Sequence, residues 1–274
     1  MILTALAVGA LIGLVVGALG AGGGILSVPA LIYLLGVAPH EATSASLVIV
    51  LFTALAALGG RIGKNTICYQ IALVFAALAT VGTWLGSLAN QAVSSDLLMY
   101  AFALLLACVG LVMLRRAYVS SNDGAAAADD AGGTGSTPAL GAVSAMGEVT
   151  SIGAVPLWRV ALVATITGAL TGFFGVGGGF AIVPALTLVL HLPIKRAAST
   201  SLLIMTITAV VALVARAQTS LNVDLGVIGA FTVASMLGAV AGAPLTRKVS
   251  SQKLTASFAA LLLAVAVATL VGQG

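Results

Sequence analysis

Two glycine-rich segments hold the residues of this 274-residue chain that are best suited to bind a ligand through backbone groups. They read GALGAGGGILSVPAL at 17–31 and GFFGVGGGFAIVPAL at 172–186, and each interrupts a long apolar run. A helix that restarts after such a break presents unpaired N–H groups and a partial positive charge in its first turn. We therefore predict that an anionic substrate binds at Gly22, Gly23, Gly24, Gly177, Gly178 and Gly179. The alternative is that these glycines only allow a tight bend and close helix packing.

A cluster of hydroxyl side chains follows each glycine break. Hydroxyls can donate a hydrogen bond to an oxyanion without carrying charge, which would hold a substrate and still let it leave. The predicted substrate-binding hydroxyls, beside Thr43, are Ser44, Ser46, Ser199, Thr200 and Ser201. The alternative is that each hydroxyl bonds back to a carbonyl of its own helix or caps that helix.

Two arginines occupy equivalent places further along the chain. Arg61 and Arg216 each follow an apolar run, and we expect them at helix ends on opposite faces of the membrane. A guanidinium group there could meet an oxyanion that enters or leaves, so both are candidate gate residues. The alternative is that they anchor the helix ends at the membrane surface.

The acidic residues are informative because none lies in the middle of an apolar run. Each of the seven carboxylates falls in a loop, in the central linker or at the end of a run. Proton and cation transporters commonly use buried carboxylates, so anions are the expected cargo. Cys68 and Cys108 lie in separate apolar runs and are interpreted as packing residues. We expect no metal site, no cofactor and no catalytic residue, because the chain has no P-loop, no HExxH and no Gly-x-Ser-x-Gly.

Composition places these residues in a membrane. Hydrophobic residues make up 61% of the chain and charged residues 7%, which no ordinary soluble domain shows. A helix needs about 20 residues to cross the hydrocarbon core. The apolar runs lie at about 2–36, 43–60, 67–89, 97–114, 157–192, 198–215, 223–246 and 254–271. The two runs of roughly 35 residues, which are the first and the fifth, are too long for one crossing and must bend back at their glycines.

The chain is also an internal repeat. An offset of 155 places Gly177 on Gly22, Pro184 on Pro29 and Arg216 on Arg61, and one inserted residue later Gly238 falls on Gly82. We predict a first membrane repeat at 1–116, a flexible cytoplasmic linker at 117–156 and a second membrane repeat at 157–274. The linker is rich in Ala, Gly, Ser and Thr and lacks the apolar content to fold alone.

The positive charges predict that the repeats are inverted. In the first half they follow the second and fourth apolar runs, and in the second half they follow the first and third. Because Lys and Arg collect in cytoplasmic loops, corresponding loops would lie on opposite sides. The predicted fold is an all-α integral membrane protein with two inverted-topology repeats, each a glycine-broken hairpin followed by three transmembrane helices. Both termini would lie outside. If the first run crossed only once, the halves would instead be parallel, which fits the charges less well.

The repeated GAGGGILSVP and GVGGGFAIVP segments, each followed by an Ala-x-x-(Ser/Thr)-Ser type of stretch, resemble the TauE/SafE sulfite exporter family. The first half reads Ala42-Thr43-Ser44-Ala45-Ser46 and lacks the Thr-Ser pair found at Thr200 and Ser201. The resemblance implies a multi-pass permease of the cytoplasmic membrane that moves small sulfur oxyanions or organosulfonates, usually outward. We expect an alternating-access site between the repeats, no nucleic-acid partner and no enzymatic activity. An anion channel, or an uptake permease for another small anion, is the alternative.

Overall fold

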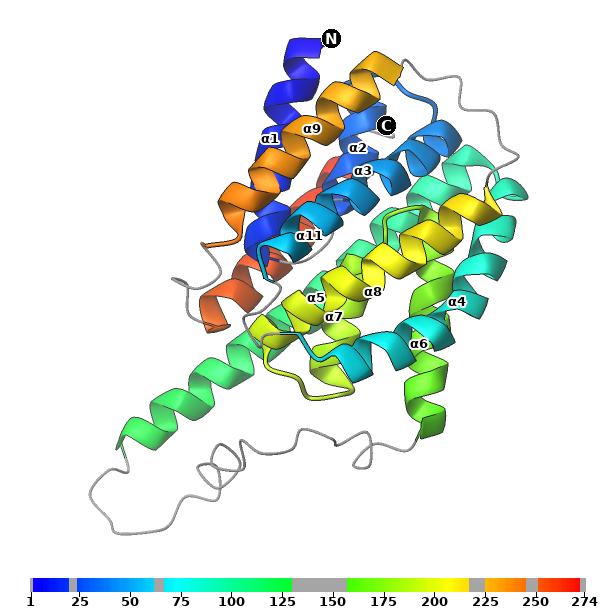
Figure 1. Cartoon of the computed structure of the whole chain (residues 1–274). Coiled ribbons are helices and arrows are strands. Elements are labelled where there is room, and N and C mark those ends of the chain that lie inside the picture. Colours follow the sequence, from blue (N-terminus) through cyan, green and yellow to red (C-terminus); the bar gives the residue numbers. More distant parts are fainter. Residues whose placement is uncertain are drawn as a thin grey trace.

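The computed structural model describes residues 2–19, 24–61, 67–129, 157–216, 225–244 and 251–271, and over these residues it contains helices and no strand. The helices of the first half are α1 (Ile2–Leu19), α2 (Gly24–Tyr33), α3 (Pro39–Gly59), α4 (Tyr69–Gln91) and α5 (Ser95–Asp129). The helices of the second half are α6 (Leu157–Phe174), α7 (Gly179–Leu188), α8 (Ile194–Ala215), α9 (Leu225–Gly242) and α11 (Ser251–Val271). They form one bundle, from which the end of α5 projects (Figure 1). The predicted all-α class is confirmed.

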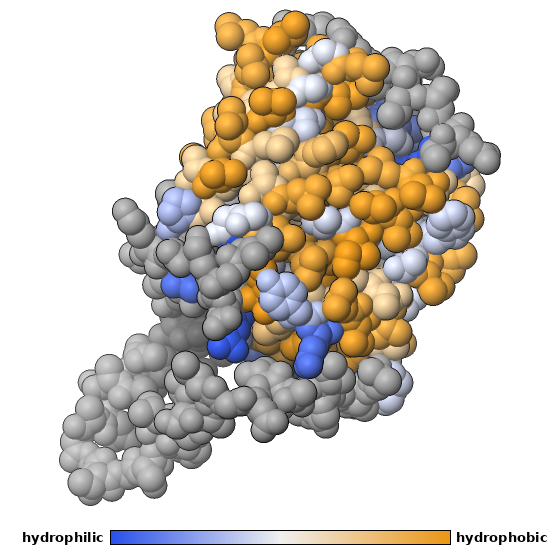
Figure 2. Space-filling model, viewed as in Figure 1, coloured by the Kyte–Doolittle hydropathy of each residue, from blue (hydrophilic) through white to orange (hydrophobic). Residues whose placement is uncertain are grey.

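Several of these helices are suited to cross a lipid bilayer. Among the described residues, α3, α4, α8, α9 and the 95–115 part of α5 are each long and apolar enough for a crossing, and α1, α2, α6 and α11 contribute shorter apolar helices or helical segments. Apolar side chains also cover much of the outer surface (Figure 2). Leu3, Leu104 and Leu237, for example, are 81%, 66% and 68% exposed. A surface of this kind is stable in lipid rather than in water, so the chain is a multi-pass membrane protein.

Both long apolar runs divide at their glycine-rich segments. The first gives α1, which ends at Leu19, and α2, which begins at Gly24; the second gives α6, which ends at Phe174, and α7, which begins at Gly179. In the second half the short helix packs back against the long one that precedes it. A helix of 10 residues rises only about 15 Å, so α2 and α7, which begin at the buried Gly24 and Gly179, are too short to cross a bilayer on their own.

Helix α5 extends beyond the predicted start of the linker. The first repeat was expected to end at residue 116, but α5 continues as a helix through Asp129. The reason is local, because residues 125–128 are four consecutive alanines and alanine has the highest helix propensity. The remainder of the predicted linker, 130–156, lies outside the described residues.

Glycines bring two pairs of helices into backbone contact, and each pair joins one half to the other. In the first pair, α1 and α9, a Cβ atom at Gly13 or Gly17 would overlap the carbonyl oxygen of Ser235 or Ala239. In the second pair, α4 and α6, a Cβ atom at Gly168 would overlap the carbonyl oxygen of Ala79. We call these two pairs the outer pairs. Figure 1 shows α1 beside α9 and α4 beside α6, with α3 and α8 between them.

Helix packing follows the internal repeat. With α1 to α5 matched in order to α6, α7, α8, α9 and α11, every extensive contact has a counterpart after the halves are exchanged. The contact of α1 with α9 becomes that of α6 with α4, and α3 with α9 becomes α8 with α4. Three contacts map onto themselves, namely α3 with α8, α5 with α11 and α2 with α7. We call α3 and α8 the central pair.

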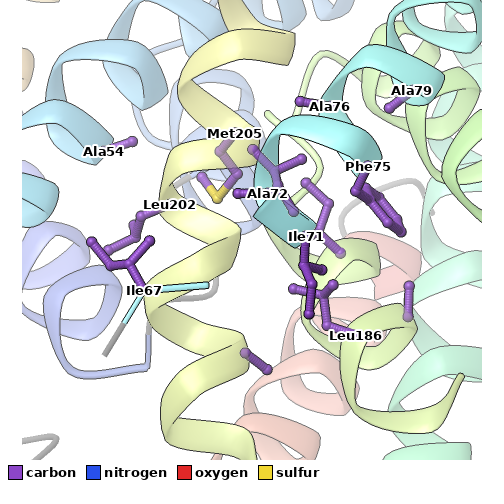
Figure 3. Close-up of a cluster of buried hydrophobic side chains, with 14 of the residues drawn as sticks. Ala54, Ile67, Ile71, Ala72, Phe75, Ala76, Ala79, Leu186, Leu202 and Met205 are labelled. Atoms are coloured by element: carbon purple, nitrogen blue, oxygen red, sulfur yellow. The ribbon is translucent and has the colours of Figure 1, made fainter. Parts of the chain in front are cut away.

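Apolar clusters fix the central pair against its neighbours. One cluster joins α4 and α8, with Phe75 fully buried near Ala72 of α4, Met205 of α8 and Leu186 of α7 (Figure 3). Close packing of this kind holds the two ends of α3 and α8 in place, and those ends carry the polar residues described next.

Candidate functional site

The second glycine break is a turn that only glycine adopts without strain. Gly175, Gly177 and Gly178 have φ angles of 65°, 67° and 71°, a left-handed conformation that costs other L-residues about 1–2 kcal/mol. Gly178 is the N-cap residue of α7, and no side chain caps that helix end. The N–H groups at the start of α7 are therefore left for backbone or ligand groups to satisfy.

The two breaks meet inside the protein. A Cβ atom at Gly24, the first residue of α2, would overlap the backbone of Val176 in the other break, and a Cβ atom at Gly177 would overlap the side chain of Val50 on α3. Ser46 of α3 donates a hydrogen bond to the carbonyl oxygen of Gly175. Gly24, Gly177, Gly178 and Gly179 are buried, whereas Gly22 and Gly23 lie outside the described residues.

The predicted hydroxyl clusters are also buried, and most of their hydrogens are already bonded. Ser46, Ser199 and Ser201 donate to the carbonyl oxygens of Thr43, Lys195 and Ala198, each three or four residues earlier on the same helix. Thr43 likewise donates to the carbonyl oxygen of His40 at 2.8 Å, and Thr200 accepts from the backbone N–H of Cys68 at 3.1 Å. The four donating hydroxyls bond to their own helices, so they offer oxygen lone pairs rather than further hydrogens to other groups.

The two arginines supply donors to these lone pairs. Arg61, at the end of α3, donates to the hydroxyl of Ser199 at 3.0 Å and to the carbonyl oxygen of Gly17 at 2.6 Å. Its side chain is 6% exposed and that of Arg216 is 4% exposed, so neither projects to the surface. We call Arg61 with its partners the Arg61 cluster.

Arg216 repeats this arrangement at the opposite end of the central pair. It follows α8 and donates to the hydroxyls of Thr43 at 2.9 Å and Ser44 at 3.2 Å, and also to the carbonyl oxygen of Gly172. We call this group the Arg216 cluster. Since the end of each central helix contacts the start of the other, α3 and α8 run antiparallel. Each arginine thus joins its own half of the chain to the hydroxyls of the other half.

Sequence reasoning missed two polar residues of α4 that extend the Arg216 cluster. Asn90 donates to the carbonyl oxygen of Phe173 at 2.6 Å, and its side-chain oxygen lies 3.4 Å from Nδ1 of His40. Ser87 is fully buried beside Gly172. The signal that could have found them is the spacing of Thr83, Ser87 and Asn90, which places three polar side chains on one face of an otherwise apolar helix.

The described residues hold no group of three or more His, Cys, Asp or Glu side chains that could bind a metal ion. Cys68 and Cys108 form no disulfide with each other; Cys108 is exposed and Cys68 is half-buried. The chemistry that the described site offers is hydrogen bonding by guanidinium, hydroxyl and backbone groups, and such groups suit an anion.

Broken helices that meet inside a bundle, with buried polar residues on the helices around them, are the plan of a membrane transporter. This chain belongs to the sulfite exporter TauE/SafE family, whose sequence model matches residues 5–269. It is therefore a membrane transporter of that family and not an enzyme.

Curated relatives agree with this class. The chain is 33% identical over 262 residues to a "Probable membrane transporter protein" of Xylella fastidiosa (strain 9a5c), an alignment that covers 94% of this chain and 91% of that protein. It is 27% identical over 209 residues to the "Probable membrane transporter protein YunE" of Bacillus subtilis (strain 168), which covers 72% of this chain and 71% of that protein. No solved structure matches the chain.

Proposed function

We propose that this transporter exports a small sulfur-containing anion, such as sulfite or an organosulfonate, by alternating access between its two halves. The observation that carries the proposal is the pair of buried guanidinium groups, one at each end of the antiparallel central pair. A buried cation is costly unless an anion or several hydrogen bonds compensate it. The name of the matched family supports a sulfur oxyanion as the cargo, while the curated relatives are named only as transporters.

The antiparallel central pair supports the inverted topology on which alternating access would depend. Equivalent helices that run in opposite directions would place the Arg61 cluster and the Arg216 cluster toward opposite faces of the membrane. The proposed backbone donors to the anion are Gly22 to Gly24 and Gly177 to Gly179. In this topology both termini lie outside, residues 117–156 lie in the cytoplasm and the protein sits in the cytoplasmic membrane.

The test is flux of sulfite, sulfoacetate and sulfate into proteoliposomes, with and without the same anion on the far side. A transporter should give a rate that saturates with concentration and increases in the presence of counter-anion. A rate that rises linearly and ignores counter-anion would favour an anion channel. Absence of flux for all three anions would overturn the proposed cargo.

The contribution of the second glycine break is tested with Gly178→Leu. We expect this variant to insert but to lose transport, because leucine adopts the required φ of 71° poorly and its Cβ would overlap the Thr171 hydroxyl. Gly59→Leu is the matched control, since a Cβ atom at Gly59 has nothing within 4 Å. Size-exclusion profiles would establish that both variants fold. If Gly178→Leu does not fold, Gly177→Ala takes its place. Full activity in the break variants would contradict a role for this backbone.

A further inference from the structure

The two arginine clusters occupy equivalent places, but their chemistry differs. In the described part of the chain, the partners of Arg216 are all neutral oxygen atoms, namely the hydroxyls of Thr43 and Ser44 and the carbonyls of Gly172 and Phe173. Its Nε atom is buried and has no hydrogen-bond partner there. A guanidinium group that is 4% exposed and has no carboxylate partner among the described residues retains much of the cost of burying its charge.

Two hydroxyl groups beside Arg216 also have hydrogens to donate. Ser44 accepts from Arg216 at 3.2 Å, and its own hydroxyl has no acceptor among the described residues. Ser87 lies beside Gly172, whose carbonyl accepts from Arg216, and the Ser87 hydroxyl is buried with no partner in the described structure. Buried polar groups are normally hydrogen-bonded, so three unpaired donors in one place require an explanation.

The equivalent positions in the other half are different. Ser199 corresponds to Ser44, but it donates to the carbonyl oxygen of Lys195 at 3.1 Å. Ala243 corresponds to Ser87 and Ala198 to Thr43, so neither offers a hydroxyl. The Arg216 cluster therefore contains hydrogen-bond donors that the corresponding residues of the other half do not supply.

We propose that Arg216 is the counter-ion of the transported anion, which binds to Arg216 Nε and to the hydroxyls of Ser44 and Ser87. This inference rests on the proposed function and places its strongest binding site at one end of the central pair. An oxyanion of the sulfite or sulfonate type has three oxygen atoms, and the site offers three donors. The single positive charge attracts the anion, while the two neutral hydroxyls add directional hydrogen bonds without a second charge that would oppose release. The Arg61 cluster then serves mainly to join the two halves.

The test compares matched variants of the two clusters in detergent solution, with thermal stabilisation by sulfite, sulfoacetate or sulfate as the measure of binding. Arg216→Gln should raise the concentration needed for half-maximal stabilisation by about a hundredfold, as expected when one partner of a buried charge pair is removed. Arg61→Gln should raise it far less, because distant sites act nearly independently. Arg216→Lys, which keeps the charge and loses the planar donor fork, should lie between wild type and Arg216→Gln.

A second pair of variants supplies an internal anion. Ser44→Asp would place a carboxylate on Arg216, and Ser199→Asp would place one on Arg61. We expect Ser44→Asp to raise the melting temperature without added anion and to lose the response to anion, while Ser199→Asp keeps most of that response. These variants also answer the question if Arg216→Gln does not fold.

The outcomes separate this inference from the proposed function. If an anion stabilises the wild type and stabilises Arg216→Gln and Ser44→Asp equally well, the assignment of Arg216 is overturned and the proposed function stands. If Arg61→Gln and Arg216→Gln lost equal amounts of the stabilisation by anion, the assignment of the stronger binding site to Arg216 would be overturned. A wild-type protein that responds to none of the three anions would overturn the proposed cargo and this site together.

Discussion

The outer pairs and the central pair are held by different kinds of contact. In α1 with α9, and in α4 with α6, glycines place one helix backbone directly on another. In α3 with α8, each end is joined through an arginine and the hydroxyls of the opposite helix. The first kind of contact depends on shape and tolerates no added atom, whereas the second can exchange one hydrogen-bond acceptor for another at a net cost of about 1 kcal/mol.

This difference indicates where the protein can move. Each outer pair should behave as a rigid unit, because separating glycine-packed helices loses close packing along their whole length. The arginines lie where the units meet, since Arg61 also binds the end of α1 through Gly17, and Arg216 also binds the end of α6 through Gly172. An anion that binds at Arg216 would therefore act directly on the joint between an outer pair and the central pair.

The largest effect is expected from an added methyl group in an outer pair. Gly13→Ala should lower the free energy of unfolding by about 3 kcal/mol or more, because its Cβ would overlap the carbonyl of Ser235 and force the helices apart. Gly229→Ala is the matched control on α9, since a Cβ atom there has nothing within 4 Å. Thermal unfolding in detergent measures both. Equal melting temperatures for the two variants would show that the outer pairs are not held by glycine packing.

A smaller effect on stability, with a larger one on transport, is expected in the central pair. Ser199→Ala removes one acceptor of the buried Arg61 and should cost about 1.5–3 kcal/mol, the range for hydrogen bonds to charged groups. The initial rate of anion flux should fall together with this stability, because the contact lies where an outer pair meets the central pair. A variant that is destabilised but keeps the wild-type rate would make the Arg61 cluster purely structural.

The smallest effect is expected from a polar contact inside an outer pair. Ser235 of α9 donates to the carbonyl oxygen of Gly9 on α1 at 3.0 Å. Ser235→Ala should cost about 0.6 kcal/mol, the average for hydrogen bonds between membrane helices, and should leave flux at the wild-type level. A loss of transport in Ser235→Ala comparable to that in Ser199→Ala would remove the distinction between rigid and exchangeable contacts.

Much of the fold was predictable because its signals are local. Apolar runs and glycine clusters predicted where helices lie and where the first and fifth runs break, since hydrophobic length and left-handed backbone are properties of short segments. The helix beyond residue 116 was not predicted because the linker was judged by composition, while its alanine run 125–128 favours a helix.

The contacts of the site were not predictable in the same way. The repeat pairs Arg61 with Arg216, but no spacing in the sequence says that each reaches the hydroxyls of the other half, because helix periodicity gives the buried face and not the partner. Ser87 and Asn90 were missed because they lie within or next to the apolar run at 67–89 and outside the repeated glycine and hydroxyl segments. The roles of the glycines, hydroxyls and arginines in binding an anion remain predictions that the variants above test.

The exchange symmetry of the helix contacts has a consequence for the origin of this chain. Every extensive contact between the halves maps onto an equivalent one when the halves are swapped, so a polypeptide of half the length could form the same bundle with a second copy of itself. Because α3 and α8 run antiparallel, the two copies would have to insert into the membrane in opposite orientations. Gene duplication and fusion would then have freed each copy to diverge, and the hydroxyls of Thr43 and Ser87, which correspond to Ala198 and Ala243, would record that divergence.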